Sequence, residues 1–149
     1  MFIRKKETRQ LNARIEQAFG IPDFFGKKDE VEVKDNIYYK NKQPVFFEQE
    51  GRLFPTLKNI LNQDLKLKQI IVDMPAVPFV AKGADIMRPG IVDFDPEIEK
   101  DEIIVIADEN NRKPLAIGIA LFSGQELKQM DKGKVIKMIH YVGDEIWKA

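Results

Sequence analysis

The sequence has no cysteine and only one histidine in 149 residues. Without cysteine, the chain forms no disulfide and offers neither a thiolate zinc site nor a cysteine nucleophile. The histidine, His140, lies in an apolar strand pattern beside Tyr141, and no serine or cysteine motif surrounds it. A single histidine cannot make a metal site or a catalytic triad by itself, so we expect it to have a packing role. We therefore expect no metal or other cofactor.

Long apolar runs are also missing. The longest, PLAIGIALF, is far shorter than the roughly 18 residues that indicate a membrane-spanning helix. The start, MFIRKKETRQ, is charged and is not followed by the apolar core of a signal peptide. We therefore expect a cytoplasmic protein that does not interact with a membrane.

The formal net charge is zero, which argues against nonspecific polyanion binding by the chain as a whole. The charges are unevenly distributed, however. Residues 1–69 contain 14 Lys and Arg against 10 Asp and Glu, whereas residues 70–149 contain 10 against 14. The sequence pattern changes at the same point, so we expect two domains, 1–69 and 70–149.

The first domain is predicted to be a small α+β unit. The run KETRQLNARIEQAFG has the spacing of an amphipathic helix that stops at Gly20, with apolar residues at Leu11, Ile15, Ala18 and Phe19. The short β-prone runs EVEVK, IYY and PVFFE follow, separated by turn residues, and predict an antiparallel meander of three or four strands. The run PTLKNILNQ then predicts a short helix with Pro55 in its first turn.

The second domain is predicted to be a small mixed barrel with short helices. FVAKGA is expected to form one helical turn ending at Gly83, and DIMRPGIVDFD to be extended. SGQELKQM is expected to be a helix capped by Ser123 or Gly124. Further strands are predicted in IIV (Ile70–Val72), EIIVIADE, PLAIGIALF and VIKMIHYV, and Gly118 within the third of these marks a bend or a close neighbour.

Two charged segments could bind ions. In an extended chain, one face would carry the carboxylates of an acidic run, Asp93, Asp95, Glu97 and Glu99. A calcium loop requires a glycine and a glutamate where this run has Ile98 and Ile104, so a solvated strand edge is the favoured interpretation. The segment Lys132–Lys134 contains the Lys-Gly-Lys of phosphate loops without their upstream glycines, and is read as a cationic turn.

The aromatic residues of the meander could stack on nucleic-acid bases, but their alternation favours a place in the core. They are Tyr38, Tyr39, Phe46, Phe47 and Phe54.

The stretch FVAKGADIMRPGI, residues 79–91, is the strongest candidate for a binding site. Gly83 and Ala84 would leave the backbone bare, and the cations Lys82 and Arg88 could each contact a phosphate. Alternatively, the glycines only shape a tight corner between a helix and a strand. The residues alone leave both interpretations open.

The second half resembles a PUA domain, the RNA-binding domain named after pseudouridine synthases and archaeosine transglycosylases. The matching features lie between Ile70 and Trp147: Lys-Gly-Ala, Arg-Pro-Gly, Ala-Ile-Gly-Ile-Ala, Lys-Gly-Lys and His-Tyr-Val-Gly-Asp. The segment VFFEQEGRLFPTLKNI, residues 45–60, resembles the N-terminal domain of the malignant-T-cell-amplified-sequence family, which joins such a domain to a PUA domain. The short, cysteine-free sequence is similar to an archaeal member.

The resemblance implies a noncatalytic protein that binds structured RNA, either tRNA or small-subunit rRNA, in translation initiation or ribosome recycling. It also implies a partner similar to the density-regulated protein. The RNA-binding positions that it implies are Phe79, Lys82, Gly83, Ala84, Arg88, Pro89, Gly90, Lys134 and Lys137. The acidic residues 93–102 are a poor RNA surface, so we expect the contact on another face.

The sequence is compatible with one other function and argues against a third. The protein could be an adaptor that docks a translation or RNA-modification partner through its N-terminal domain. An RNA-modifying enzyme is disfavoured, because the first half is small and has no recognisable pair of acids, nucleophile or metal constellation.

Overall fold

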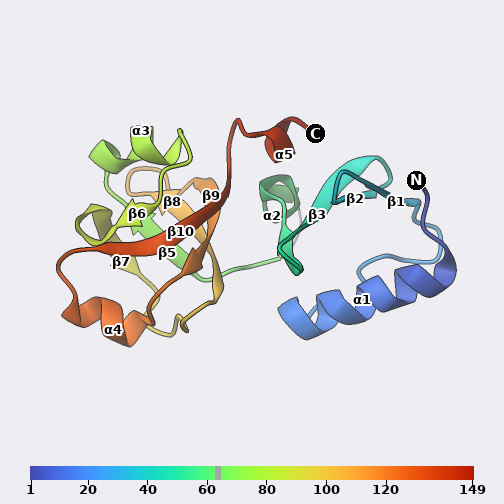
Figure 1. Ribbon diagram of the computed structural model, residues 1–149, viewed down its shortest axis with the longest axis horizontal. Coiled ribbons are helices and arrows are strands. Elements are labelled where there is room, and N and C mark those ends of the chain that lie inside the picture. Colours follow the sequence, from blue (N-terminus) through green and yellow to red (C-terminus); the bar gives the residue numbers. More distant parts are fainter. Residues whose placement is uncertain (63–64) are drawn as a thin grey trace. The chain divides into compact units, whose positions relative to one another are not determined.

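The computed structural model describes residues 1–62 and 65–149 (Figure 1). The chain divides into two compact units, Met1–Leu65 and Lys66–Lys148, and each has its own cluster of buried hydrophobic residues. Within the described residues, no helix has both the length and the apolar character required to cross a bilayer.

The first unit opens with α1, Lys5–Phe19, as its apolar spacing predicts. Leu11 and Ile15 are buried against the unit's core, and the remaining faces carry polar side chains. Gly20 ends the helix in the left-handed conformation, with φ of 73°, and its N–H donates to the Glu16 carbonyl at 2.8 Å. Glycine takes this conformation without the steric cost that a side chain imposes.

Four antiparallel strands form the predicted meander in the order β1-β2-β3-β4. They are β1 Val31–Lys34, β2 Ile37–Lys40, β3 Gln43–Gln49 and β4 Arg52–Pro55. Two residues join each strand to the next, and both have the positive φ that type I′ turns require. These pairs are Asp35 and Asn36, Asn41 and Lys42, and Glu50 and Gly51.

The predicted helix after the meander is α2, Leu57–Asn62, but the prediction for Pro55 was wrong. Pro55 ends β4 and pairs with Phe46. A proline is tolerated there because β4 is an edge strand whose outer side needs no N–H donor. Thr56 takes the capping role instead, since its hydroxyl accepts a hydrogen bond from the Asn59 N–H at 3.1 Å.

The aromatic residues of the meander lie mostly in the core, as their alternation favoured. Phe46 is fully buried and makes an edge contact with Phe24, with 5.0 Å between ring centroids. Phe47 and Phe54 are also buried and stack at 5.4 Å. Tyr38 and Tyr39 are half-buried. The buried rings therefore offer no platform for stacking bases.

The second unit is a mixed six-stranded sheet that curls into a nearly closed barrel, so the predicted fold class is confirmed. Its order is β6-β10-β9-β8-β5-β7, and β5 and β8 are parallel whereas the other neighbours are antiparallel. The strands are β5 Gln69–Val72, β6 Ile86–Met87, β7 Ile91–Phe94, β8 Ile103–Asp108, β9 Pro114–Ala120 and β10 Lys134–Tyr141.

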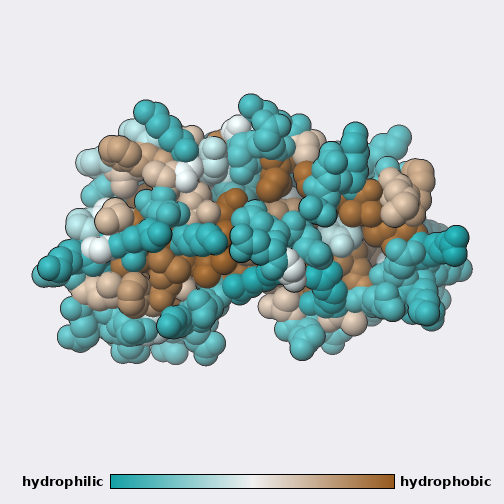
Figure 2. All heavy atoms as spheres, in the orientation of Figure 1, coloured by the Kyte–Doolittle hydropathy of each residue, from teal (hydrophilic) through white to brown (hydrophobic). Residues whose placement is uncertain are grey.

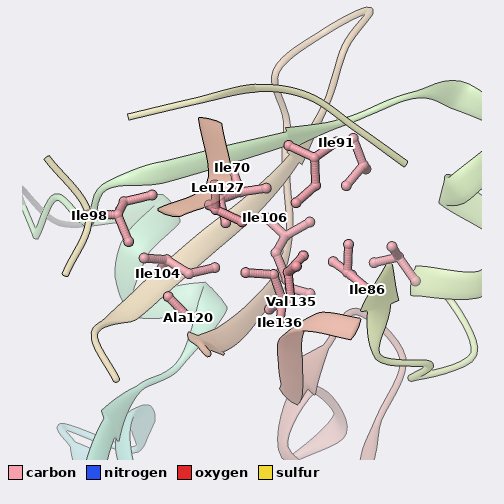
Figure 3. Packing of buried hydrophobic residues seen from close by; sticks show 13 residues of the cluster. Ile70, Ile86, Ile91, Ile98, Ile104, Ile106, Ala120, Leu127, Val135 and Ile136 are labelled. Atoms are coloured by element: carbon pink, nitrogen blue, oxygen red, sulfur yellow. The ribbon is translucent and has the colours of Figure 1, made fainter. Parts of the chain in front are cut away.

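Short helices connect these strands or, in the case of α5, follow the last of them. They are the 3-10 turns η1 Met74–Ala76 and η2 Arg88–Gly90, and the helices α3 Val77–Val80, α4 Gly124–Gln129 and α5 Glu145–Lys148. Of the two predicted caps, Ser123 and Gly124, it is Ser123 that caps α4, through a capping box with Glu126. Gly118 lies against a close neighbour, because an added Cβ would be 2.6 Å from the Ile136 side chain. Branched aliphatic side chains fill the interior (Figure 3).

Two predictions of extended chain were wrong. DIMRPGIVDFD is interrupted by η2, because Pro89 fixes φ and the chain turns between β6 and β7. The acidic run leaves the strand after Phe94, and the Asp95 side chain accepts a hydrogen bond from the Glu97 N–H in a local turn. Because β7 ends at Phe94, only Asp93 of the four acids lies on the strand, and the four carboxylates do not share one strand face. Asp93 is exposed on the edge strand β7, as expected of a solvated edge.

Candidate nucleic-acid interface

A pocket of about 350 Å³ lies between α3 and β6. Its lining is almost entirely apolar or backbone: Ala76, Phe79, Val80, Ala84, Asp85, Ile86, Met87 and Gly90. The volume is at the lower end of the range of small-ligand pockets. Three residues predicted for binding, Phe79, Ala84 and Gly90, are thus brought together in one hollow.

Two large apolar side chains at this pocket are exposed. Phe79 has 65% of its surface accessible and Met87 has 51%. Phe79 is the second-to-last residue of the one-turn helix α3, so its ring is held on a short, capped element. An exposed ring on a fixed backbone can stack on an unpaired base at little cost in side-chain entropy.

The corner after α3 is a Schellman turn. The Gly83 N–H donates to the Val80 carbonyl at 3.0 Å, and the Ala84 N–H donates to the Phe79 carbonyl at 3.1 Å. The Lys82 N–H also donates to Phe79. The backbone amides that we expected to be bare therefore already serve the helix end.

Gly83 has two structural reasons to be glycine. Its φ is 82°, in the left-handed region. In addition, a Cβ at this position would be 2.6 Å from the ring of Tyr141. The corner is therefore tight, and the packing of Tyr141 against Gly83 fixes the turn beside the pocket.

Tyr141 is in turn held by the carboxylate of Asp144, which accepts a hydrogen bond from the Tyr141 N–H at 3.0 Å. His140 is buried, with Nδ1 at 2.8 Å from the same carboxylate, and the Trp147 N–H donates to it at 2.8 Å. Burial raises the pKa of Asp144, but the bonds from His140, Trp147 and Tyr141 outweigh it, and the net pKa is lowered. The histidine thus has a structural partner.

Arg88 is directed into the fold rather than toward the pocket. Its Nε donates to the Leu127 carbonyl at 3.0 Å, and its Nη1 donates to the Ile91 carbonyl at 3.2 Å. The guanidinium carbon also lies 5.4 Å from the centre of the Phe94 ring. This side chain therefore ties η2 to α4 and β7.

Exposed lysines provide the positive charge near the pocket. Lys82 is exposed on the turn after α3. Lys134 pairs with Met87 in the sheet register, and its Nζ lies 3.5 Å from the Asp85 carboxylate. The register of β10 shifts between Lys134 and Ile136, so Lys134 and Lys137 are both exposed while the two residues between them are buried.

The last two predicted residues lie in η2. Pro89 is exposed, whereas Gly90 is half-buried and its carbonyl accepts a hydrogen bond from the Asp73 N–H at 2.9 Å. A Cβ on Gly90 would be 3.3 Å from that of Ala76, so the small residue keeps η1 and η2 close.

Sequence reasoning missed Met87 and Asp85. The alternation of buried Ile86 with exposed Met87 is a weak signal in a strand of only two residues. Asp85 was missed because its role is tertiary: its carboxylate accepts a hydrogen bond from the Met138 N–H at 2.8 Å and pairs with Lys134. This acid thus fixes β10 beside the pocket.

The arrangement is suited to binding. It has an apolar hollow, an exposed aromatic ring and flanking lysines, which together match the surface of an unstacked base and its phosphates. Among the described residues, no group of three or more histidines or acids is placed to hold a metal ion.

Comparison with known families identifies both parts of the chain. The family model for the PUA domain matches residues 68–142, and a model for a domain of unknown function, DUF1947, matches residues 1–63. An uncharacterized protein of Methanocaldococcus jannaschii is 38% identical, covering 98% of this chain and 93% of its own length. The chain belongs to the PUA-domain family. Its second unit is the PUA domain.

Relatives in eukaryotes share both parts of the chain. Translation machinery-associated protein 20 of Schizosaccharomyces pombe is 30% identical, over 99% of this chain and 90% of the relative. Malignant T-cell-amplified sequence 1 of Rattus norvegicus is 31% identical, over 91% of this chain and 82% of the relative. The resemblance stated from the sequence is therefore confirmed.

A solved PUA-domain structure from Aeropyrum pernix, in complex with tartrate, has a similar fold. It is 25% identical with a TM-score of 0.83, and the match covers 99% of this chain and 88% of that one.

Proposed function

We propose that this PUA-domain protein binds structured RNA, either tRNA or small-subunit rRNA, in translation initiation or ribosome recycling. The observation that carries the proposal is the apolar pocket beside the exposed ring of Phe79, flanked by Lys82 and Lys134. The name of one relative, translation machinery-associated protein 20, places that relative with the translation machinery, and this supports the proposed role in translation.

In this proposal, the role of each residue follows from the chemistry of its side chain. Phe79 stacks on an unpaired base, and Met87 and Ala84 contact its edge within the pocket. Lys82, Lys134 and Lys137 neutralise phosphates. Gly83, Pro89 and Gly90 shape the surface, and Arg88 keeps η2 in place through its bonds to two carbonyls.

The test is a titration of the full chain with tRNA and with a small-subunit rRNA fragment at several salt concentrations. Phe79→Ala removes a stacking ring, which contributes about 1–3 kcal/mol per base, so affinity should fall roughly 5- to 150-fold. Lys82→Ala removes one phosphate contact and should reduce the slope of log affinity against log salt by about 1.

Two matched controls accompany these variants. Val92→Ala truncates an exposed apolar side chain, 52% accessible, on β7. Lys113→Ala removes an exposed cation from the turn before β9. Both controls should bind as the wild type does. Equal affinity of wild type and Phe79→Ala for both RNAs would remove the pocket from the RNA surface.

The proposal includes no catalytic step, and we place its action in the cytoplasm. It also includes a protein partner similar to the density-regulated protein, which the family resemblance implies. Co-purification of the full chain from its own cells, with and without ribonuclease, tests this. A partner retained after ribonuclease treatment supports direct docking, whereas loss of all partners contradicts it.

A further inference from the structure

The N-terminal unit carries a cluster of six exposed cations at the beginning of α1 and on the loop beside it. This cluster, here termed the α1 basic patch, comprises Arg4, Lys5, Lys6, Arg9, Lys27 and Lys28. The family model that covers this unit describes a domain of unknown function. The role of the patch is therefore open.

The fold places the loop lysines beside the helix. Asn12 of α1 makes two hydrogen bonds of 2.9 Å with the backbone of Phe25. At the other end of the loop, the Ile3 N–H donates to the Val31 carbonyl at 2.9 Å. The segment that carries Lys27 and Lys28 thus runs back along α1 toward its first turn (Figure 1).

Within the described part of the chain, none of the six forms an ion pair with a carboxylate within 4.0 Å. By contrast, Arg14 farther along α1 pairs with Glu48 at 2.8 Å.

Their position is also electrostatically unfavourable. The first turn of a helix favours acids because of the helix dipole, yet here Glu7 is the single acid beside Lys5 and Lys6. Lys5 and Arg9 are four residues apart on one face and repel each other. Arg4 stands at the N-cap, where no side chain caps the helix. A polyanion bound there would relieve this repulsion.

We propose that the α1 basic patch is a second RNA-contacting surface, which binds the phosphate backbone independently of sequence. Phe2 is 63% exposed two residues before Arg4 and forms a β-bridge with Glu32, and an exposed aromatic ring close to cations in the sequence suits single-stranded or looped RNA. An anionic membrane fits less well, because amphipathic helices insert their apolar face, and that of α1 is buried in the core through Leu11 and Ile15. The inference rests on the proposed RNA-binding function.

The test compares two triple variants of the full chain that change the net charge equally. Lys5→Ala, Lys6→Ala and Arg9→Ala together remove half of the patch while alanine preserves the helix. The control triple is Lys100→Ala, Lys113→Ala and Lys128→Ala, all exposed in the PUA domain. The patch variant should lose at least about tenfold in affinity for tRNA at low salt, and its salt slope should fall by about 2–3. The control should change neither.

A second variant, Lys27→Ala with Lys28→Ala, tests the patch from a separate segment and should reduce the slope by about 1–2. Circular dichroism checks that α1 remains folded. If Phe79→Ala weakens RNA binding but both patch variants bind as the control does, the patch inference fails and the proposed function stands. If only the patch variants weaken binding, the patch stands and the pocket fails. Loss of binding to phosphatidylserine vesicles, with RNA binding unchanged, would overturn the inference in favour of a membrane surface.

Discussion

Replacing Arg88 with alanine should destabilise the PUA domain. The guanidinium donates to the carbonyls of Leu127 and Ile91, from α4 and at the start of β7. Hydrogen bonds that involve a charged group contribute about 1.5–3 kcal/mol each. Because Arg88 is half-buried, water can reach the two carbonyls in the variant and replace part of the lost hydrogen-bond energy. We therefore expect a loss of about 2–4 kcal/mol in the free energy of unfolding.

The assay is urea unfolding followed by the fluorescence of Trp147, the single tryptophan of the chain, which lies in α5. Arg88→Lys keeps the charge but lacks the fork of donors, so it should recover less than half of the loss. Lys82→Ala is the control for removing a cation and should change stability by less than about 0.5 kcal/mol. An Arg88→Ala protein that is as stable as wild type but binds RNA poorly would refute the structural role. Arg88 would then be a residue that contacts the RNA.

Two further predictions concern the support of the pocket. Gly83→Ala places a methyl group 2.6 Å from the Tyr141 ring and in a left-handed conformation, so it should cost about 2–4 kcal/mol in the same urea assay; a loss below about 1 kcal/mol would show that Tyr141 yields easily. Asp144 has a lowered pKa in the fold, so its stabilisation is complete above its ordinary value of 3.8 and is lost as pH falls through the lower folded value. The stability of Asp144→Asn should therefore vary less with pH below about 4 than that of wild type, and parallel curves would contradict the assignment.

Local sequence patterns predicted much of the fold. The spacing of Leu11 and Ile15 fixed the face of α1, and the turn residues between the β-prone runs marked the hairpins correctly, including Asp35 and Asn36 with positive φ. Ser123, one of the two caps predicted, is the cap of α4. In each case the decisive contacts are short-range or depend on one residue's geometry.

Features that depend on tertiary neighbours were not predictable. Pro55 fits a helix start as well as an edge strand, and only its pairing with Phe46 separates the two. The sequence shows Arg88 as a cation near a glycine, but gives no sign of the carbonyls of Leu127 and Ile91 to which it donates. Likewise, the ring of Tyr141 leaves no room for a side chain at Gly83, and Tyr141 is distant from Gly83 in the sequence.

The distribution of charge over the surface was not predictable from the composition either. A net charge of zero argued against nonspecific polyanion binding, yet exposed cations gather at the beginning of α1 and acids in residues 93–102. Figure 2 shows polar and apolar surface interspersed over the visible face rather than divided into halves. The local charge pattern, not the total, determines where an RNA can approach.

The central claim is that RNA contacts the pocket between α3 and β6. Ultraviolet cross-linking of the full chain to tRNA or to a small-subunit rRNA fragment, followed by peptide mapping, tests it most directly. We predict nucleotide adducts on the peptides that contain Phe79 and Lys134, with the adduct near Phe79 lost in Phe79→Ala. Adducts confined to the acidic residues 93–102, or absent from α3, β6 and the start of β10, would contradict the account.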